Sequence, residues 1–414
     1  MIAHVDMDCF FVAIERFKDP SLVGKAVAVG GDPEKGRSVV TSASYEARQY
    51  GIHSAMPMAV AIRRCPHLVV VPVDFERYDR VHLEVKKVLE SFSPAVDMTS
   101  IDEGYVDLTG TGRLWGPPLK AAERIKWAVQ EATGLTCTVG LAKNRLVAKI
   151  ASGWAKPDGL LHIPPQQVEK LLAPLPVEAI PGVGEKMAAT LRSLGLERVG
   201  QIQAVDESLM DATFGAFGRS LWRAARGEDP SWGRDPASRI PSGRDRGAGH
   251  GTSRKSISKE ITFPVDTTDR KYLVSVLHYL TEKVCRSLRQ KSRAARTVNV
   301  KLRYEDFETR LASATFNEPE NRDEAIFSSA WRLMEKAITR RVGIRLVGVS
   351  LSNLTGCVHQ TDLFEETGWV KGWQRLQAVD LTRERFGFNA VLSGEAIYLL
   401  AYPPDRLFRH RGSV

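Results

Sequence analysis

The sequence has few cysteines, no long apolar run and no large excess of charge of either sign. Its five cysteines stand far apart, without a Cys-x-x-Cys pair or the spacing of a metal site. This pattern excludes a disulfide framework and a zinc finger, and it indicates reduced thiols that act as small hydrophobic residues. No apolar run approaches the roughly 20 residues needed to cross a bilayer, and no signal peptide is recognisable. We therefore expect a cytoplasmic protein without a membrane-bound segment.

The charge of the chain is distributed unevenly. The 414 residues are 43% hydrophobic and 26% charged, which is typical of a globular protein long enough for two to four domains. Residues 239–310 contain 17 Lys and Arg against 8 Asp and Glu, whereas the rest of the chain contains 41 of each sign. This basic region indicates a polyanionic partner such as nucleic acid, with a merely solvated basic surface as the alternative.

Two stretches place acidic residues inside apolar, β-prone runs. Residues 1–10 are predicted to form a strand, on which Asp6 and Asp8 share one face because they are two residues apart. Residues 100–108 form a similar run that contains Asp102 and Glu103. Buried carboxylates are costly unless a cation neutralises them, so the two runs predict a shared divalent-metal site. The alternative is a pair of strand ends whose acids point into solvent.

Adjacent residues on an ideal strand point to opposite faces, so Asp102 and Glu103 can share a site only if the local structure departs from an ideal strand or one side chain reaches the other face. Either the backbone bends locally, or the longer Glu103 side chain reaches round the strand. The sequence leaves both alternatives open.

Residues 1–163 alternate between short strands and amphipathic helices. On the predicted helix 44–51, Tyr45 and Arg48 lie three residues apart on one face. Lys156 lies at the end of the predicted helix 144–155, which Pro157 terminates. The pattern predicts an α+β sheet covered by helices. Its remaining predicted elements are strands 26–29, 39–41, 68–71 and 137–141, a strand pair within 96–109, and helices 76–91 and 119–132.

The following region is built of short helices around a glycine turn. Residues 180–186, Ile-Pro-Gly-Val-Gly-Glu-Lys, precede an apolar helix and are typical of a helix-hairpin-helix motif. In such a motif, glycine amides and the N-terminus of the second helix receive a phosphate, which makes Gly182, Gly184 and Lys186 candidates for DNA binding. A purely structural turn is the alternative.

The C-terminal part is predicted to contain a second sheet and a tail. Residues 226–256 are rich in Gly, Ser and Arg and form the best linker candidate. Residues 257–351 follow a β-α-β-β-α-β pattern, in which Lys301 and Arg303 share a strand face and Lys283, Arg286 and Arg289 share a helix face. The tail contains Gln-Thr-Asp-Leu-Phe at 360–364 and an amphipathic stretch at 372–386.

Several of these motifs occur together in one known family. The stretches 6–11, 45–48, 100–103, 143–145 and 155–157, in this order and spacing, resemble the Y-family DNA polymerases, and within them the DinB branch of bacterial DNA polymerase IV. The resemblance implies an α+β multidomain fold, that of a right-hand polymerase with a ferredoxin-like palm. The segments it implies are the palm (1–10 and 74–163), small fingers (11–73), a helical thumb with the helix-hairpin-helix (164–228), a linker (229–252), a little finger with a split β-α-β sheet (253–354) and a C-terminal tail with a clamp-binding motif (355–414).

The resemblance also implies a two-metal site for nucleotidyl transfer. Asp6, Asp102 and Glu103 match the catalytic metal ligands, and the carbonyl of Met7 matches a further one, for two Mg²⁺ ions with Mn²⁺ as an alternative. Asp8 matches a family acid that is not a direct ligand. The strand-face argument made Asp8 the equal of Asp6, and at this position we follow the family.

Further roles follow from the same resemblance. Phe11 matches the steric gate that excludes a ribose 2′-OH, and a core aromatic is its alternative. The residues that match a nucleotide site are Phe10, Phe11, Ser42, Tyr45, Arg48 and Lys156. The DNA-binding candidates are Gly182, Gly184, Lys186, Arg254, Lys301 and Arg303. Gln360, Leu363 and Phe364 resemble a peptide that binds the sliding clamp. In contrast to many family members, some fifty residues follow this peptide; they either fold back on the protein or help to bind another protein.

The expected function is therefore template-directed, low-fidelity DNA synthesis across lesions, without a proofreading exonuclease. The expected partners are primer–template DNA, a dNTP and a sliding clamp. We expect a monomer in the bacterial cytoplasm, associated with the nucleoid when bound to DNA. Two alternatives belong to other classes: a non-catalytic scaffold of the same ancestry, and a nucleotide cyclase, which shares a palm-like sheet with paired carboxylates but has no use for the helix-hairpin-helix.

Overall fold

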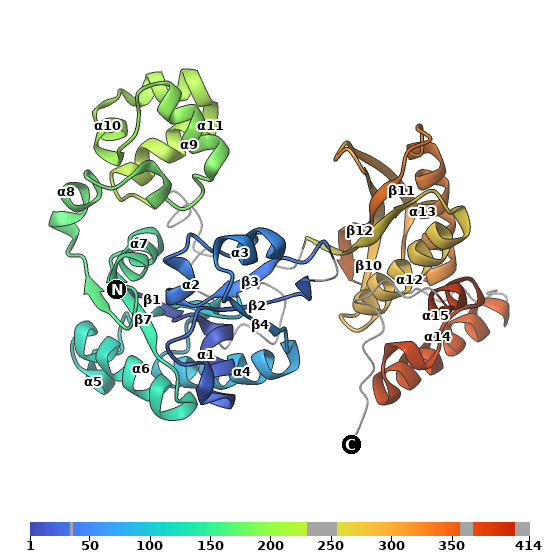
Figure 1. Ribbon diagram of the computed structural model, residues 1–414, viewed down its shortest axis with the longest axis horizontal. Coiled ribbons are helices and arrows are strands. Elements are labelled where there is room, and N and C mark those ends of the chain that lie inside the picture. The colour runs from blue at the N-terminus through green and yellow to red at the C-terminus, as the bar shows by residue number, and fades with distance from the viewer. Residues whose placement is uncertain (34–35, 230–254, 357–366, 402–414) are drawn as a thin grey trace. The chain divides into compact units, whose positions relative to one another are not determined.

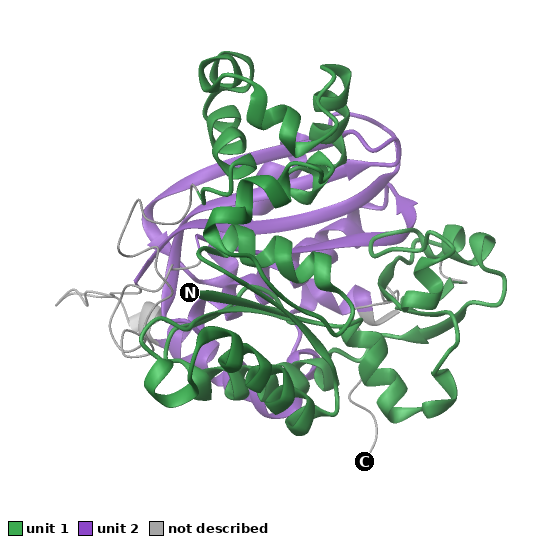
Figure 2. Cartoon of the chain, turned by 90° about the vertical axis from the view of Figure 1, so that its left-hand side faces the viewer, with its two compact units in different colours: residues 1–251 green, residues 252–414 purple. Residues whose placement is uncertain are grey.

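The computed structural model describes residues 1–33, 36–229, 255–356 and 367–401. The chain divides into two compact units, Met1–Gly251 and Thr252–Val414, which Figure 2 colours green and purple. Arg254 and the predicted clamp-binding residues Gln360, Leu363 and Phe364 lie outside the described residues. The finer division of the first unit into palm, fingers and thumb stays a prediction. In the described part of the chain, no helix has the length and apolar character needed to cross a membrane.

The first unit is organised around strand β1 (Ile2–Met7). This strand pairs antiparallel with β6 on one side and β7 on the other. The order of the five-stranded sheet is β5 (Val96–Met98), β6 (Glu103–Asp107), β1, β7 (Cys137–Ala142) and β8 (Leu160–His162). The chain order β1-α4-β5-β6-α6-β7 combined with this strand order is the ferredoxin-like arrangement predicted for the palm.

Helices cover both faces of this sheet (Figure 1). Because side chains alternate along a strand, Ala3, Val5 and Met7 of β1 point to one face. They join the core formed with α4 (Phe75–Phe92) and α6 (Pro118–Thr133). Helix α7 (Arg145–Ala155) packs on the opposite face, where His4 and Asp6 point. The two polar residues of β1 therefore both face α7.

Strand β1 is shorter than predicted. It ends at Met7, Cys9 adopts a left-handed conformation with φ of 44°, and α1 (Phe10–Lys18) begins directly after it. The apolar residues of α1 are buried at helical spacing, which the prediction of a strand through residue 10 overlooked. Asp8 therefore stands in a turn, and the prediction that Asp6 and Asp8 share a strand face is wrong.

A small second sheet and a helical region complete the first unit. The sheet, in the order β3-β2-β4, consists of β2 (Val27–Gly30), β3 (Val40–Ala43) and β4 (Val69–Pro72). The Ser44 hydroxyl caps the short helix that carries Tyr45, because it accepts a hydrogen bond from Ala47 N at 3.1 Å. The other helices are α2 (Tyr45–Arg48), α3 (Met58–Arg64), α5 (Gly112–Trp115), α8 (Val168–Leu172), α9 (Glu185–Ser193), α10 (Val199–Ala204) and α11 (Glu207–Ala225).

The second unit has the predicted β-α-β-β-α-β order. Its sheet order is β11-β10-β12-β9, which differs from that of the first sheet although the chain order of strands and helices is the same. On β10, Val298, Val300 and Leu302 point into the core with the helices, whereas Lys301 and Arg303 lie on the other face. The elements are β9 (Ser256–Thr267), α12 (Arg270–Arg289), β10 (Arg293–Tyr304), β11 (Thr309–Glu320), α13 (Asp323–Ala337) and β12 (Ile344–Gly356).

Residues 367–401, which follow the predicted clamp motif, fold back onto the helices of the second unit. Helix α14 (Thr367–Phe386) is followed by short helical turns and α15 (Tyr398–Ala401), and Figure 1 shows them beside α12. Ala396 and Leu399 of this C-terminal appendage, residues 367–401, are fully buried in the core. For residues 367–401, the structure therefore shows folding back on the protein, the first of the two alternatives for the tail.

Buried ion pairs attach the appendage. Arg383 donates to Glu282 at 2.8 Å, and Arg289 contacts both Asp380 at 2.6 Å and Asp323 at 2.7 Å. Arg289 is only 6% exposed. The helix face that the sequence presented as cationic is thus partly used for attachment of the appendage, and Arg289 is not available there to DNA.

We expect Leu399→Ala to destabilise the second unit by about 2–5 kcal/mol, because it leaves a cavity in a closed core. Leu381→Ala is the matched control: this leucine belongs to the same appendage but is 67% exposed. Chemical denaturation followed by circular dichroism measures both. Equal, small effects would show that the appendage is not part of the folded core.

Candidate active site

Three predicted carboxylates meet at one end of the central strand. Asp6 of β1 is the direct cross-strand neighbour of Glu103, the first residue of β6. Asp102 lies in the bend before that strand, where its carbonyl accepts a hydrogen bond from Met7 N at 2.9 Å. Ser100 Oγ donates to Asp102 Oδ1 at 2.5 Å and so fixes the side chain. Of the two alternatives for the adjacent pair, the backbone bend is the one observed.

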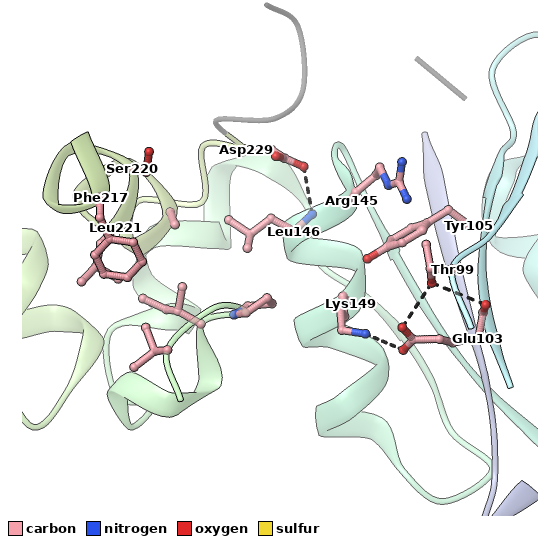
Figure 3. Close-up of a pocket in the computed structure, with 14 residues that line it drawn as sticks. Thr99, Glu103, Tyr105, Arg145, Leu146, Lys149, Phe217, Ser220, Leu221 and Asp229 are labelled. Carbon is pink, nitrogen blue, oxygen red and sulfur yellow. Dashed lines mark hydrogen bonds and ion pairs between the residues drawn. The ribbon is translucent and has the colours of Figure 1, made fainter. Parts of the chain in front are cut away.

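Two lysines of one helix contact these acids. Lys156, at the C-terminal end of α7, donates to Asp6 Oδ1 at 2.5 Å and lies 3.3 Å from the Met7 carbonyl oxygen. Lys149, two turns earlier, donates to Glu103 Oε2. Figure 3 shows this contact, with Thr99 on the other side of Glu103, where it donates to Oε1 at 3.2 Å. Each of these two carboxylates therefore has its own ammonium partner.

Burial and these partners shift the two acids in opposite directions. The imidazole of His4, 3.4 Å from Glu103 Oε2, together with Lys149 lowers the pKa of Glu103 to about 2, against the opposing effect of burial. For Asp6, burial dominates and raises the pKa, although the Lys156 ammonium opposes the rise. Burial raises a carboxylate pKa and neighbouring cations or donors lower it. At Glu103 the two partners, His4 and Lys149, outweigh burial, whereas at Asp6 burial outweighs the single ammonium of Lys156.

Asp8 has a separate environment. Its carboxylate accepts hydrogen bonds from Thr138 Oγ1 at 2.9 Å, from Asp158 N at 2.9 Å and from the Tyr45 hydroxyl at 3.3 Å. The residue is 5% exposed. A buried carboxylate with three donors is satisfied within the protein, so Asp8 connects β7, the loop after α7 and the helix that carries Tyr45.

The predicted nucleotide-binding residues surround the same strand end. The Arg48 guanidinium lies 5.0 Å from the centre of the Tyr45 ring and donates to the Ala43 carbonyl at 3.2 Å. Burial, with the nearby Asp8 carboxylate, raises the pKa of the Tyr45 hydroxyl, which therefore stays protonated as a donor. Ser42 is 9% exposed on β3, next to β2. Tyr45 reaches Asp8, which links this group to the end of β1.

Phe11 lies in an aromatic cluster at the start of α1. Its ring stacks on Tyr78 of α4 with 4.3 Å between centroids, and Phe10 lies 5.6 Å from it. Tyr78 is anchored by its hydroxyl, which donates to Glu15 at 2.8 Å. The stack holds the Phe11 ring in one position. A steric gate requires this, and a core aromatic would show the same contact, so Phe11 as the gate stays a prediction.

Among the DNA-binding candidates within the described residues, Gly182, Gly184 and Lys186 are exposed, whereas Lys301 and Arg303 are partly buried. Gly182 has φ of 99°, a conformation that favours glycine, and Gly184 is the N-cap of α9. Side chains of Lys301 and Arg303 lie on the open face of the second sheet, where Lys301 contacts Glu260 at 2.9 Å and Arg303 donates to Thr309. Lys186 is exposed in the first turn of α9.

A cavity of about 520 Å³ lies beside Glu103. Figure 3 shows that one side is formed by the sheet and α7 and the other by the helical region near residues 180 and 217–224. Its polar side includes Lys149 and Arg145, and Arg145 stacks over Tyr105 at 4.0 Å and pairs with Asp97 at 2.8 Å. The carboxylate Glu103 is thus accessible from an open space between two parts of the first unit.

The chemistry of the ligand set fits a divalent ion, but its present arrangement does not enclose one. Carboxylate and carbonyl oxygens are the ligands that Mg²⁺ prefers, and Asp6, Asp102, Glu103 and the Met7 carbonyl supply them. Within the described residues, however, no three His, Cys, Asp or Glu side chains form a group that could hold a metal. To bind one ion together, the Asp6 and Glu103 side chains would have to rotate away from Lys156 and Lys149.

Sequence reasoning missed three residues around Glu103. His4 is buried, and its Nδ1 lies 2.6 Å from Ser152 Oγ, which in turn donates to the Lys149 carbonyl. Two signals were available: His4 precedes Asp6 by two residues, which places both on one strand face, and Lys149, Ser152 and Lys156 recur at helical spacing.

Comparison with known proteins identifies the family. The chain matches the impB/mucB/samB family over residues 5–153, the DNA polymerase-iota thumb domain over 178–229 and the impB/mucB/samB family C-terminal domain over 254–363. It is 35% identical over 394 residues to DNA polymerase IV of Desulfatibacillum aliphaticivorans, which covers 94% of this chain and 95% of the relative. It is 40% identical over 368 residues to DNA polymerase IV of Methanoculleus marisnigri, which covers 88% and 98%.

A solved structure agrees. A Y-family DNA polymerase chimera of Dbh and Dpo4 superposes with a TM-score of 0.72 at 25% identity, over 86% of this chain and 99% of the other. The chain therefore belongs to the Y-family of DNA-directed DNA polymerases, as its motifs predicted. Within that family it is of the DinB type, because the relatives that it matches over nearly their full length bear the name DNA polymerase IV. The predicted α+β multidomain architecture is confirmed with it.

We expect Asp8→Asn to lower the free energy of unfolding by about 1–3 kcal/mol, because an amide nitrogen replaces an acceptor among three donors. Its binding of Mn²⁺ should remain close to that of the wild type, whereas Asp6→Asn should weaken it strongly. Urea denaturation and a Mn²⁺ titration without nucleotide measure the two properties. Equal loss of metal binding in both variants would make Asp8 a metal ligand and contradict the role that the family resemblance gives it.

Proposed function

We propose that this chain catalyses template-directed addition of dNTPs to a primer 3′-OH, with low fidelity and across template lesions, without a proofreading exonuclease. The observation that carries the proposal is the meeting of Asp6, Asp102 and Glu103 at one strand end, beside Tyr45, Arg48 and Lys156. Membership in the Y-family supports the same activity.

The acids provide the metal ligands in this proposal. Two Mg²⁺ ions, when bound, would lower the pKa of the primer 3′-OH and stabilise charge on the α-phosphate and the leaving pyrophosphate. Asp6 and the Met7 carbonyl would hold one side of the site, and Asp102 and Glu103 the other. The backbone bend at Asp102 and the register of Asp6 with Glu103 support this assignment, because they bring the three residues to the same end of β1.

The triphosphate is assigned to the cationic and hydroxyl donors. Arg48 provides several N–H donors in one plane, and Tyr45 provides a hydroxyl that stays protonated. Tyr45 contacts Asp8, the residue that follows β1. Lys156 supplies an ammonium from the opposite side, at the end of α7. Ser42 and Phe10 complete the proposed nucleotide site, with Phe11 as the gate against a ribose 2′-OH.

Primer–template DNA is the proposed macromolecular partner. The exposed glycines of the helix-hairpin-helix offer backbone N–H groups to phosphates, and the open face of the second sheet offers Lys301 and Arg303. We also propose that the protein is a cytoplasmic monomer that associates with the nucleoid when it binds DNA. Residues 360–364 are proposed to bind the sliding clamp on the basis of their sequence alone.

Primer extension with Mg²⁺ and four dNTPs across undamaged and damaged templates tests the function. We expect the wild type to extend primers on both, and Asp102→Ala and Glu103→Ala to lose activity by a factor of about 10³ or more, because the metals lose a ligand. Glu131→Ala, which removes an exposed acid from α6, is the matched control. Full synthesis by the two site variants would refute the assignment, and an inactive wild type would favour the scaffold alternative.

Phe11→Ala should increase incorporation of ribonucleotides by about tenfold or more, because it removes the ring that Tyr78 holds in place. Single-nucleotide incorporation of matched rNTP and dNTP pairs measures this selectivity. Tyr78→Phe keeps the stacked ring and loses only the hydroxyl that donates to Glu15, so its sugar selectivity should not change. Unaltered selectivity in a folded Phe11→Ala protein would make Phe11 a core aromatic.

A further inference from the structure

Lys156 contacts two oxygens that the proposed function assigns to a metal. Its ammonium nitrogen is 2.5 Å from Asp6 Oδ1 and 3.3 Å from the Met7 carbonyl oxygen. The Lys156 side chain is 20% exposed and that of Asp6 is 19% exposed, so the contact is largely enclosed. A divalent ion bound by these two oxygens would stand at about 2.0–2.6 Å from each. The ammonium and the ion therefore cannot both hold this position.

The same lysine is also assigned to the triphosphate. We propose that Lys156 is a movable counter-ion: it neutralises Asp6 and caps the Met7 carbonyl until metal and nucleotide bind, and it then transfers its ammonium to the triphosphate. This inference rests on the proposed function. Lys156 is thus a positioning residue for the metal ligands in one state and a nucleotide-binding residue in the other.

The surroundings of Lys156 allow such a transfer. The residue lies at the C-cap of α7, with extended backbone angles of −61° and 144°, so the helix does not constrain the side chain. The flexible four-carbon stem and three donors of lysine suit exchange between oxygen partners, whereas the flat fork of an arginine does not. The negative charge brought in by the nucleotide offers the ammonium a new partner, so the exchange does not leave a charge unpaired.

Lys149 differs from Lys156 in one important respect. It contacts Glu103 beside His4, and no contact with the Met7 carbonyl is recorded for it among the described residues. Both lysines contribute one positive charge near the site. Only Lys156, however, covers a position shared by a side-chain and a backbone oxygen. The two lysines therefore separate the effect of a nearby charge from the effect of occupying the position.

The proposal predicts opposite effects of one substitution. Lys156→Met should bind Mn²⁺ about tenfold more tightly without nucleotide, since a competitor present about nine-tenths of the time weakens apparent affinity by that factor. The same variant should show a raised KM for dNTP in primer extension, because the triphosphate loses its cation. A lysine that only binds phosphate would raise KM and leave the Mn²⁺ affinity unchanged.

Electron paramagnetic resonance of free Mn²⁺, with protein but no DNA or dNTP, measures the affinity. Lys149→Met controls for loss of a nearby charge and Lys120→Met for loss of a surface lysine paired with an acid. We expect the gain to be larger for Lys156→Met than for Lys149→Met, and absent for Lys120→Met. It should disappear when Asp6→Asn is combined with Lys156→Met. An equal gain from Lys149→Met, or none from Lys156→Met, would overturn the proposal.

A measurement on the wild type tests the same proposal without depending on whether Lys156→Met folds. With carbon-13 methyl groups on its lysines, the Lys156 signal, identified by its absence in Lys156→Arg, should move when Mg²⁺ is added alone. A stationary signal during metal binding would overturn the transfer. Primer extension by the wild type keeps the two claims distinct: if it fails, the proposed function fails; if it succeeds while the Lys156 signal stays fixed, only the transfer is wrong.

Discussion

The register between β1 and β6 is the constraint on which the active site depends. It makes Asp6 and Glu103 direct neighbours, and the bend before β6 adds Asp102. A slip of one residue would turn every side chain of β1 to the other face, which would bury Asp6 among the residues of α4 and α6. The apolar residues Ala3, Val5 and Met7 prevent that slip. The core on one face of the sheet thereby holds the chemistry in place on the other.

Helix α7 contributes the opposite charges to the same arrangement. Lys149 and Lys156 approach two acids that the sheet has already placed, and His4 connects the strand to the helix through Ser152. A cluster of acids alone would repel itself in a partly buried site, so the lysines make its assembly favourable during folding. In the proposed mechanism, metal and nucleotide replace the two lysines as cationic partners of acids that the sheet has already brought to one strand end.

Much of the fold was predictable from the sequence, because the alternation of apolar and polar residues is clear in strands and helices that bury only one face. The second sheet followed its predicted order of strands and helices, and the paired acids were found from their apolar surroundings. The end of β1 was mispredicted because Phe10 and Phe11 suit a strand and a helix equally well; only burial against α4 shows which one forms. The spacing of His4 and Lys149 placed them on the same strand and helix faces as Asp6 and Lys156, but they were missed because their role arises from contacts between distant segments.

The appendage, residues 367–401, is a second case in which the sequence did not identify the contacts that a segment makes. An amphipathic stretch after a short motif is compatible with a free tail, and sequence alone leaves its partner open. In the structure its partners are charged residues of α12: Glu282 accepts a hydrogen bond from Arg383, and Arg289 donates to Asp380. Removing one member of such a buried pair leaves the other charge without compensation, which makes the loss of either partner costly. Residues 367–401 therefore belong to the fold of the second unit.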